Sequence, residues 1–180
     1  MLKPPPAPTL KPRIDPSRDH ILGSLEAPIE LVEYGDFECP HCGRAFAIVQ
    51  QLRADLGERL RFAFRHFPLA KMHPHARKAA EAAEAAGAQG KFWEMHDVLF
   101  HHGTELELGN ITRYAEQLGL DIPRFKSEIQ SEKYSARVQE DLASGVRSGV
   151  NGTPTFFLNG TRHNGGYDYD ALRAAIESAK

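Results

Sequence analysis

Two cysteines separated by two residues stand where a strand-like run of this chain gives way to a helix-like run. Cys39 and Cys42 are the two cysteines of the sequence, and they enclose Pro40 and His41. The run at 29–34 is short, apolar and β-branched, which favours a buried strand. After the pair, apolar residues recur at steps of three and four, and proline suits the first turn of a helix. The fold must therefore bring a buried strand to the start of a helix that carries both thiols.

The remaining pattern predicts the other elements of an α/β fold. At 59–65, apolar side chains alternate with arginines as in a strand, and a helix between two such strands makes them parallel. Segments between about 75 and 147 have helical spacing. Near the end, 155–158 predicts a strand, Asn159 and Gly160 predict a two-residue hairpin turn, and a short returning strand leads into a last amphipathic helix.

Composition and charge limit the classes of partner. The 22 basic and 24 acidic residues nearly cancel, so we expect no nucleic-acid partner. No apolar run approaches the roughly 20 residues that cross a membrane. Residues 1–16 hold six of the 12 prolines and little apolar surface, which predicts a proline-rich disordered tail. Because this tail has no signal-peptide core, we expect a cytoplasmic protein, or a periplasmic one if the chain is a processed or fused fragment.

The position of the cysteine pair predicts two unequal thiols. Cys39 would stand at the N-terminus of the helix, where the partial positive charge of the helix stabilises a thiolate. The ring of His41 would favour the anion further. Cys42, one turn later, points the same way and can form a disulfide with Cys39. Because a stabilised thiolate stabilises the reduced form, the disulfide becomes a better oxidant, and we predict that the pair oxidises its substrates.

Two other uses of the pair stay open at this point. A C-x-x-C pair can be half of a zinc site, with the missing ligands supplied by His73 and His75 or by His101 and His102. The pair can also be an inert disulfide, although so short a loop adds little stability. The setting between a strand and a helix favours redox chemistry, with no metal and no cofactor.

Two further segments are candidates for the same site. Glu33 lies inside the apolar run before the cysteines. It is either a buried acid with a raised pKa, able to take a proton from Cys42, or an edge residue that faces solvent. Thr153 and Pro154 come directly before the strand at 155–158, where proline is tolerated. Backbone groups before this proline could pair with an extended substrate peptide.

Four segments resemble the DsbA-like branch of the thioredoxin family, including bacterial members fused to sodium–proton antiporters. They are YGDFECPHC (34–42), GTPTFFLNG (152–160), HFPL (66–69) and GKFWEMHDVLF (90–100). The resemblance runs from about residue 20 to the C-terminus. It implies an α/β thioredoxin fold, a βαβ unit followed by a ββα unit, over residues 17–180. A helical subdomain is expected as an insertion at about 70–148.

The resemblance also implies a role for each site residue. Cys39 corresponds to the exposed nucleophile and Cys42 to the buried thiol that resolves the mixed disulfide. Thr153 and Pro154 correspond to the cis-proline loop that faces the disulfide and binds substrate. Glu33 matches the buried acid beneath the active site.

These observations together predict a protein thiol–disulfide oxidoreductase. Its partners would be polypeptides that carry thiols or disulfides and an unidentified protein that recycles the redox pair. Family members with this motif usually carry an export signal or a membrane anchor. Neither is recognised in this sequence, so a cytoplasmic reductase is an alternative. A redox-sensing binding module and a conjugating enzyme of the glutathione-transferase type are further alternatives on the same fold.

Overall fold

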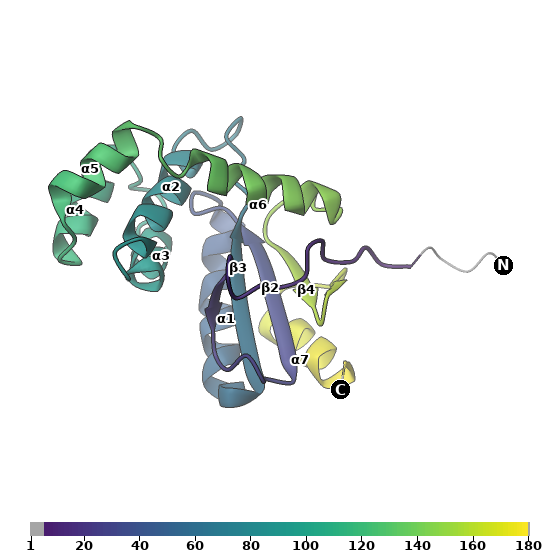
Figure 1. Ribbon diagram of the computed structural model, residues 1–180. Coiled ribbons are helices and arrows are strands. Elements are labelled where there is room, and N and C mark those ends of the chain that lie inside the picture. Colours follow the sequence, from purple (N-terminus) through teal and green to yellow (C-terminus); the bar gives the residue numbers. More distant parts are fainter. Residues whose placement is uncertain (1–5, 180) are drawn as a thin grey trace.

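A mixed five-stranded sheet forms the centre of the protein, and a computed structural model describes residues 6–179. The strand order is β1-β3-β2-β4-β5 (Figure 1). The strands are β1 (His20–Leu22), β2 (Ile29–Gly35), β3 (Leu60–His66), β4 (Thr155–Leu158) and β5 (Thr161–Arg162). The helices of the described residues are α1 (Pro40–Leu56), the single turn η1 (Gly57–Arg59), α2 (Ala76–Gly87), α3 (Phe92–His101), α4 (Leu108–Gln117), α5 (Ile122–Gln130), α6 (Ser135–Arg147) and α7 (Tyr169–Ser178). The predicted fold class is confirmed, because α2 to α6 stand between a β-α-β unit and a β-β-α unit.

Strand β2 occupies the middle of the sheet, and all seven of its residues are buried. It pairs in parallel with β3, where Glu33 lies beside Phe64, and antiparallel with β4, where Glu33 lies beside Phe156. A strand covered on both faces needs apolar side chains on both. The strand nevertheless holds two buried glutamates: Glu30 is paired with Arg61 at 2.6 Å, whereas Oε1 of Glu33 has no hydrogen-bond partner among the described residues.

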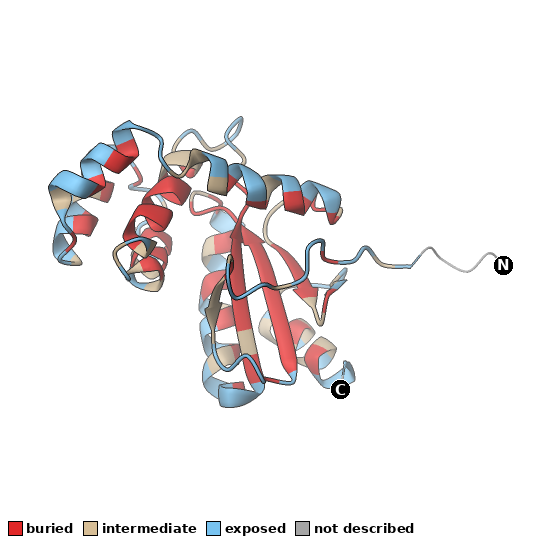
Figure 2. Cartoon of the chain, viewed as in Figure 1, coloured by how far each residue is buried: buried red, intermediate tan, exposed pale blue. Residues whose placement is uncertain are grey.

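One face of the sheet is covered by α1 and α7 (Figure 1). Leu31 of β2 and Phe62 and Phe64 of β3 point to this face and pack against the helices. The buried side of α1 consists of six residues at the predicted helical spacing, Cys42, Ala45, Phe46, Val49, Leu52 and Leu56. Figure 2 shows the resulting buried band along the sheet and the inner sides of the helices. This packing holds the N-terminus of α1 over the end of β2.

The opposite face of the sheet carries Val32, Tyr34 and Phe157. Helix α6 and the N-terminal segment lie across it (Figure 1). Leu10 of that segment is buried among these side chains. The segment therefore contributes Leu10 to the core on this face of the sheet.

The sequence predicts a disordered tail at residues 1–16. In the structure, residues 6–16 are instead docked against the sheet, whereas residues 1–5 lie outside the described part of the chain. Leu10 is only 2% exposed. The guanidinium of Arg65 donates a hydrogen bond of 2.9 Å to the backbone oxygen of Pro12. Prolines prevent regular structure here, but the segment docks because its apolar side chain and its carbonyl oxygens find partners on distant elements.

A buried ion pair holds the N-terminal segment against β3. Arg65 donates to both carboxylate oxygens of Asp19 at 2.9 Å, and both side chains are 0% exposed. A further hydrogen bond, of 3.0 Å, joins Arg65 to the hydroxyl of Tyr34. Directly after Asp19, β1 pairs antiparallel with β3. The sequence pattern did not predict this short strand.

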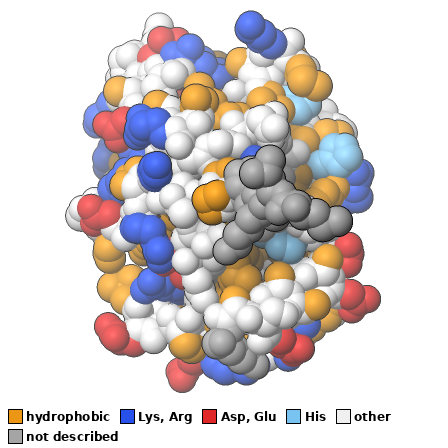
Figure 3. Space-filling view, turned by 90° about the vertical axis from the view of Figure 1, so that its right-hand side faces the viewer, with side chains coloured by type: hydrophobic (Ala, Val, Ile, Leu, Met, Phe, Trp, Pro, Cys, Tyr) orange, Lys and Arg blue, Asp and Glu red, His pale blue; other side chains and the backbone are white. Residues whose placement is uncertain are grey.

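The described surface carries charges of both signs. In the view of Figure 3, basic, acidic and hydrophobic side chains are interspersed over the face near the N-terminal segment. Among the described residues, none of the helices combines the length and the apolar character that a membrane crossing requires.

Candidate active site

The cysteine pair stands at the junction of β2 and α1. Cys39 is the residue that precedes the first turn of α1, and Cys42 lies within that turn. Both are free thiols, with Cys39 5% exposed and Cys42 0% exposed. Cys39 is thus less exposed than expected, because the loop at Thr153 covers it: the Cys39 sulfur lies 3.6 Å from the Thr153 backbone oxygen.

The surroundings of Cys39 lower the pKa of its thiol from 9.0 to about 5. The largest contribution is the thiol of Cys42, which donates toward the Cys39 sulfur, and burial opposes it. The side chain of Thr153 and the backbone N–H groups of His41 and Cys42 lower the pKa further. The amides belong to the first turn of the helix, and no well-formed side-chain cap is present at Cys39. They act mainly as dipoles that point at the sulfur.

The ring of His41 was expected to stabilise the Cys39 thiolate, but it contacts other residues. The backbone N–H of His41, at the start of the helix, does act on the Cys39 sulfur. Nδ1 of the ring lies 2.8 Å from the hydroxyl of Tyr167 and accepts a hydrogen bond of 2.8 Å from Arg44. Because a guanidinium can only donate, Nδ1 is the acceptor and the ring proton is on Nε2. The contribution of His41 to the Cys39 thiolate comes from its amide.

Cys42 has the opposite character. Burial, the hydrogen bond toward Cys39 and the nearby charge of Glu33 raise the pKa of the Cys42 thiol well above its usual value. The backbone N–H of Asp36 donates to the Cys42 sulfur at 3.4 Å. At neutral pH the site therefore combines a thiolate at Cys39 with a protonated thiol at Cys42.

Glu33 is buried beneath this pair and does not face solvent. Burial, together with the charge of Cys39, raises the pKa of the Glu33 carboxyl from 4.5 to about 8. Its Oε1 atom is buried and has no hydrogen-bond partner among the described residues. Of the two possibilities left open by the sequence, the geometry corresponds to the buried acid.

The loop before β4 closes the site from the other side. The peptide bond between Thr153 and Pro154 is cis. The Thr153 hydroxyl is buried, and its interaction with the Cys39 sulfur lowers the pKa of that thiol. The cysteines and the cis-proline loop therefore meet at one point. Cys39 and Thr153 are 114 positions apart in the sequence.

Two open grooves flank this point. One, of about 260 Å³, runs past Cys39 and Pro40 to the end of α3, and Phe100, Gly103 and Thr104 form its far wall. The other, of about 180 Å³, lies on the far side of Pro154; its lining is Pro154, Thr155, Phe156, Arg162, His163, Asn164, Gly165 and Tyr167. Sequence analysis did not identify the α3 wall, since it is formed by the packing of the inserted helices.

Sequence analysis also did not assign Asp36 to the site. Its carboxylate accepts hydrogen bonds from the backbone N–H groups of Glu38 (2.8 Å) and Leu69 (2.9 Å) and from Nδ1 of His73 (2.8 Å). It is buried, and it ties the cysteine loop to the loop after β3. The available signal was an acid directly after a predicted strand.

The histidines considered as zinc ligands are engaged with other groups. His73 bonds to Asp36, and His75 bonds to Glu38 through Nδ1 at 2.9 Å. His101 and His102 are exposed at the end of α3. Within residues 6–179, no group of three or more His, Cys, Asp or Glu side chains is arranged to hold a metal ion.

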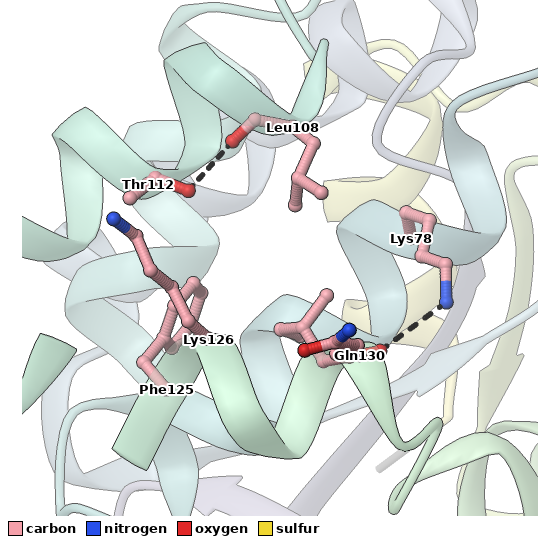
Figure 4. A pocket seen from close by; sticks show the side chains of 7 residues that line it. Lys78, Leu108, Thr112, Phe125, Lys126 and Gln130 are labelled. Atoms are coloured by element: carbon pink, nitrogen blue, oxygen red, sulfur yellow. Dashed lines mark hydrogen bonds between the residues drawn. The ribbon is translucent and has the colours of Figure 1, made fainter. Parts of the chain in front are cut away.

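A separate pocket of about 460 Å³ lies in the helical subdomain, between α2, α4 and α5 (Figure 4). Phe125, Leu108 and Ile129 make it mainly apolar, and Lys78 and Lys126 stand beside them. Neither a cysteine nor a carboxylate is among the described residues that line it.

Comparison with known proteins gives a consistent result. The model of a family described as thioredoxin matches residues 16–178. Among solved structures, a thioredoxin-like oxidoreductase from Silicibacter pomeroyi superposes with a TM-score of 0.80 at 30% identity, over 92% of this chain and 93% of that one. Oxidised BdbD from Bacillus subtilis shares the fold with a TM-score of 0.85 at 23% identity, over 97% and 98% of the two chains. The thioredoxin fold predicted from the sequence is confirmed.

Curated relatives are longer proteins. A protein of Salinispora arenicola named Na(+)/H(+) antiporter NhaA 1 is 51% identical over 166 residues, which are 92% of this chain and 25% of the relative. A protein of the same name from a Mycobacterium species is 45% identical over 174 residues, or 96% of this chain and 28% of the relative. The chain therefore spans about a quarter of the length of these relatives.

Proposed function

The chain belongs to the thioredoxin family, and from this premise we propose that it is a thiol–disulfide oxidoreductase that works through Cys39 and Cys42. The observation that carries the proposal is the pairing of two unlike thiols at one helix start, under a cis-proline loop. Cys39 is held as a thiolate and Cys42 as a thiol. An inert disulfide has no need of this difference, whereas exchange chemistry depends on it.

In the oxidising direction, a substrate thiolate attacks the Cys39 sulfur of the Cys39–Cys42 disulfide. The bond between the two cysteines breaks, and the electron pair leaves with Cys42, which takes up a proton. A second substrate thiolate then attacks the substrate sulfur of the mixed disulfide. Cys39 departs as a thiolate, and a low thiol pKa makes it a good leaving group. The substrate has gained a disulfide, and the Cys39–Cys42 disulfide has been reduced by two electrons to the dithiol.

Glu33 supports the proton transfer at Cys42. A carboxyl group with a pKa of about 8 is mostly protonated at physiological pH but keeps an ionised fraction, so it can both give and take a proton. It gives one to Cys42 when the disulfide opens and takes one when Cys42 acts as the attacking group. The interaction between Glu33 and the Cys42 sulfur fits this role.

Extended polypeptides are the proposed substrates. The two grooves continue on either side of the Cys39 sulfur, past Pro40 and past Pro154. The backbone before Pro154 offers polar groups to which a peptide can add as a short strand. A further protein whose disulfide has a higher reduction potential would return the pair to the oxidised state.

The direction of exchange depends on the compartment. Stabilisation of the Cys39 thiolate favours the oxidising direction in a periplasm-like setting, whereas glutathione and thioredoxin would keep the pair reduced in a cytosol. The proposal concerns the quarter of the antiporter-named relatives that this chain matches. Transport is not part of it.

Two cysteine variants test the function. With a peptide that carries two thiols, the oxidised protein should form the peptide disulfide, and C39S should lose this activity. C42S, mixed in its reduced form with the disulfide form of the peptide, should instead accumulate a mixed disulfide through Cys39, which mass spectrometry detects. The two variants serve as mutual controls, since each removes one sulfur from the same turn. Full activity of C39S would refute the proposal.

The reduction potential tests the direction. We expect a value well above the roughly −270 mV of thioredoxin and nearer to the roughly −120 mV of a strong oxidant. Equilibration with glutathione mixtures of known ratio measures it. A potential near that of thioredoxin would contradict the oxidising direction and leave the exchange chemistry in place.

A further inference from the structure

A narrow cleft between α1 and α3 leads from the surface to Glu33. Gln50 and Arg53 of α1 and Asp97 of α3 line its outer part, and these residues are exposed or half-buried. Glu33 and His96 form its buried part. The free space is about 10 Å³, which is room for about one water molecule.

Two buried polar atoms of the residues that line this space have no hydrogen-bond partner among the described residues. They are Oε1 of Glu33 and Nε2 of His96, and both side chains are more than nine-tenths buried. Buried polar atoms in native proteins are nearly always paired with protein or with ordered water. One water molecule in the cleft can bond to both atoms, because both residues line the same small space.

The orientation of His96 is fixed by its other ring nitrogen. Nδ1 lies 2.8 Å from a carboxylate oxygen of Asp97, to which it donates. The rest of the ring is enclosed by aromatic side chains, with centroid distances of 4.7 Å to Phe64, 4.9 Å to Phe100 and 5.0 Å to Trp93. The polar surroundings of His96 thus consist of Asp97 on the outer side and the cleft on the inner side.

The charged groups that act on His96 come from three elements. Asp97 of α3 raises its pKa, whereas His66 of β3 and Arg53 of α1 lower it. Burial is the largest influence and also lowers the pKa of His96. The resting ring is therefore neutral, with Nε2 free to accept a proton.

We propose that His96 is a proton-relay residue that connects Glu33 with solvent through this cleft. The inference rests on the proposed function, in which Glu33 takes a proton from Cys42. The Glu33 carboxyl passes that proton to the bridging water, and the water passes one of its protons to Nε2 of His96. The Nδ1 proton leaves toward the Asp97 carboxylate and solvent. The ring returns to its first tautomer when the same relay carries a proton inward, in the half-reaction in which the disulfide opens and Cys42 takes up a proton. No electrons move in this relay, and each group ends with the charge it had at the start.

The step that tests the relay is the attack of Cys42 on a mixed disulfide at Cys39. When the reduced protein is mixed with a chromogenic aromatic disulfide, the Cys39 thiolate releases the first coloured thiolate and Cys42 releases the second. The second release requires Cys42 to lose its proton, whereas the first does not. The two phases therefore separate the proposed relay from the reactivity of the nucleophile.

H96Q and H102N form a matched pair of variants for this experiment. H96Q keeps a polar side chain in the cleft but removes a group that can gain and lose protons near neutral pH. H102N removes an exposed histidine just beyond α3, outside the cleft. D97N removes the carboxylate that orients His96, and it changes only a half-buried residue.

We expect H96Q to keep the first phase and to slow the second by roughly tenfold, less than the loss of a direct acid–base group. Added imidazole buffer at constant pH should accelerate the second phase of H96Q but not of the wild type, which a merely structural role would not produce. H102N should behave as the wild type, and D97N should slow the second phase by less than H96Q.

An H96Q second phase with wild-type speed and no response to imidazole overturns the inference, while the retained first phase leaves the proposed function standing. If the wild-type protein shows no first phase, both the relay and the proposed function are refuted. If thermal melting shows that H96Q does not fold, D97N decides the question, and a wild-type second phase in D97N overturns the relay.

Discussion

Replacing Cys42 with alanine should raise the pKa of Cys39 by roughly 1–2 pH units. The Cys42 thiol is the largest of the influences that hold the Cys39 pKa at about 5. A hydrogen bond to a charged group contributes roughly 1.5–3 kcal/mol, and one pH unit corresponds to about 1.4 kcal/mol. The Thr153 side chain and the amides of the first turn remain in C42A, so the pKa should stay well below the usual 9.0.

The variant C42S is the matched control, because its hydroxyl replaces the lost donor. We expect the pKa of Cys39 in C42S to lie between those of the wild type and C42A. Thiolate absorbance in the ultraviolet, followed as a function of pH, measures the pKa, and Cys39 is the single thiol of both variants. The pH dependence of the rate of alkylation by iodoacetamide gives a second measurement.

A C42A titration that coincides with the wild type would refute the reasoning. The low pKa would then arise from the helix start and the Thr153 loop, and Cys42 would serve only as the resolving thiol. A C42S titration above that of C42A would also contradict it, since the hydroxyl would not be acting as a donor.

Two further predictions concern stability. In the reduced protein the pKa of Glu33 is raised from 4.5 to about 8, so the folded state holds a proton that the unfolded chain releases above about pH 4.5, and the contribution of Glu33 to the free energy of unfolding should fall as pH rises from about 5 to 8. The lowered pKa of Cys39 contributes in the opposite direction over this range, in the wild type and in E33Q alike. E33Q lacks the Glu33 penalty, which is on the order of 4 kcal/mol at pH 8; urea unfolding at both pH values should therefore show the stability of E33Q rising relative to that of the wild type, and equal slopes would contradict the assignment. D19N leaves Arg65 charged and without its carboxylate in a site where both side chains are 0% exposed, so it should lower the free energy of unfolding by roughly 3–5 kcal/mol. In the same assay, followed by Trp93 fluorescence, E94Q, which breaks the exposed Lys91–Glu94 pair, should cost no more than about 1 kcal/mol, and a D19N effect of that size would show that the buried pair is replaceable.

The elements around the cysteines were predictable because their signals are local. In α1, the spacing of apolar residues identified the buried side, and Pro40 marked the start of the helix. The alternation in β3 assigned Phe62 and Phe64 to the face under α1. Such patterns depend on the period of a single element, which the sequence contains in full.

The N-terminal region was not predictable in the same way. A three-residue strand such as β1 shows no period, and its partner Phe64 lies far along the chain from His20. Alternation in β3 assigned Arg65 to the other face but could not reveal that the face is buried. That burial depends on Leu10 and Asp19, whose docking is a long-range event.

The residues of the site also fall into those that the sequence identified and those that depend on long-range packing. Cys39, Cys42, Glu33, Thr153 and Pro154 were singled out from the sequence, and the structure brings all five together. The direction of the His41 ring was not foreseen, because it depends on Tyr167 and Arg44. Asp36 and His96 were missed as well. Two of the partners of Asp36 lie in the loop after β3, far along the chain from it, and the cleft at His96 forms only when α3 packs beside α1.

The complete burial of Cys42 has a consequence for damage by peroxide. Peroxide that reaches the Cys39 thiolate converts it to a sulfenic acid. The shielded thiol of Cys42 stands beside it and condenses with it, which releases water and forms the disulfide. Because this condensation is intramolecular, it competes with the second oxidation that would make the irreversible sulfinic acid. An oxidant that would destroy an isolated thiolate therefore returns this pair to the disulfide from which its own reaction begins.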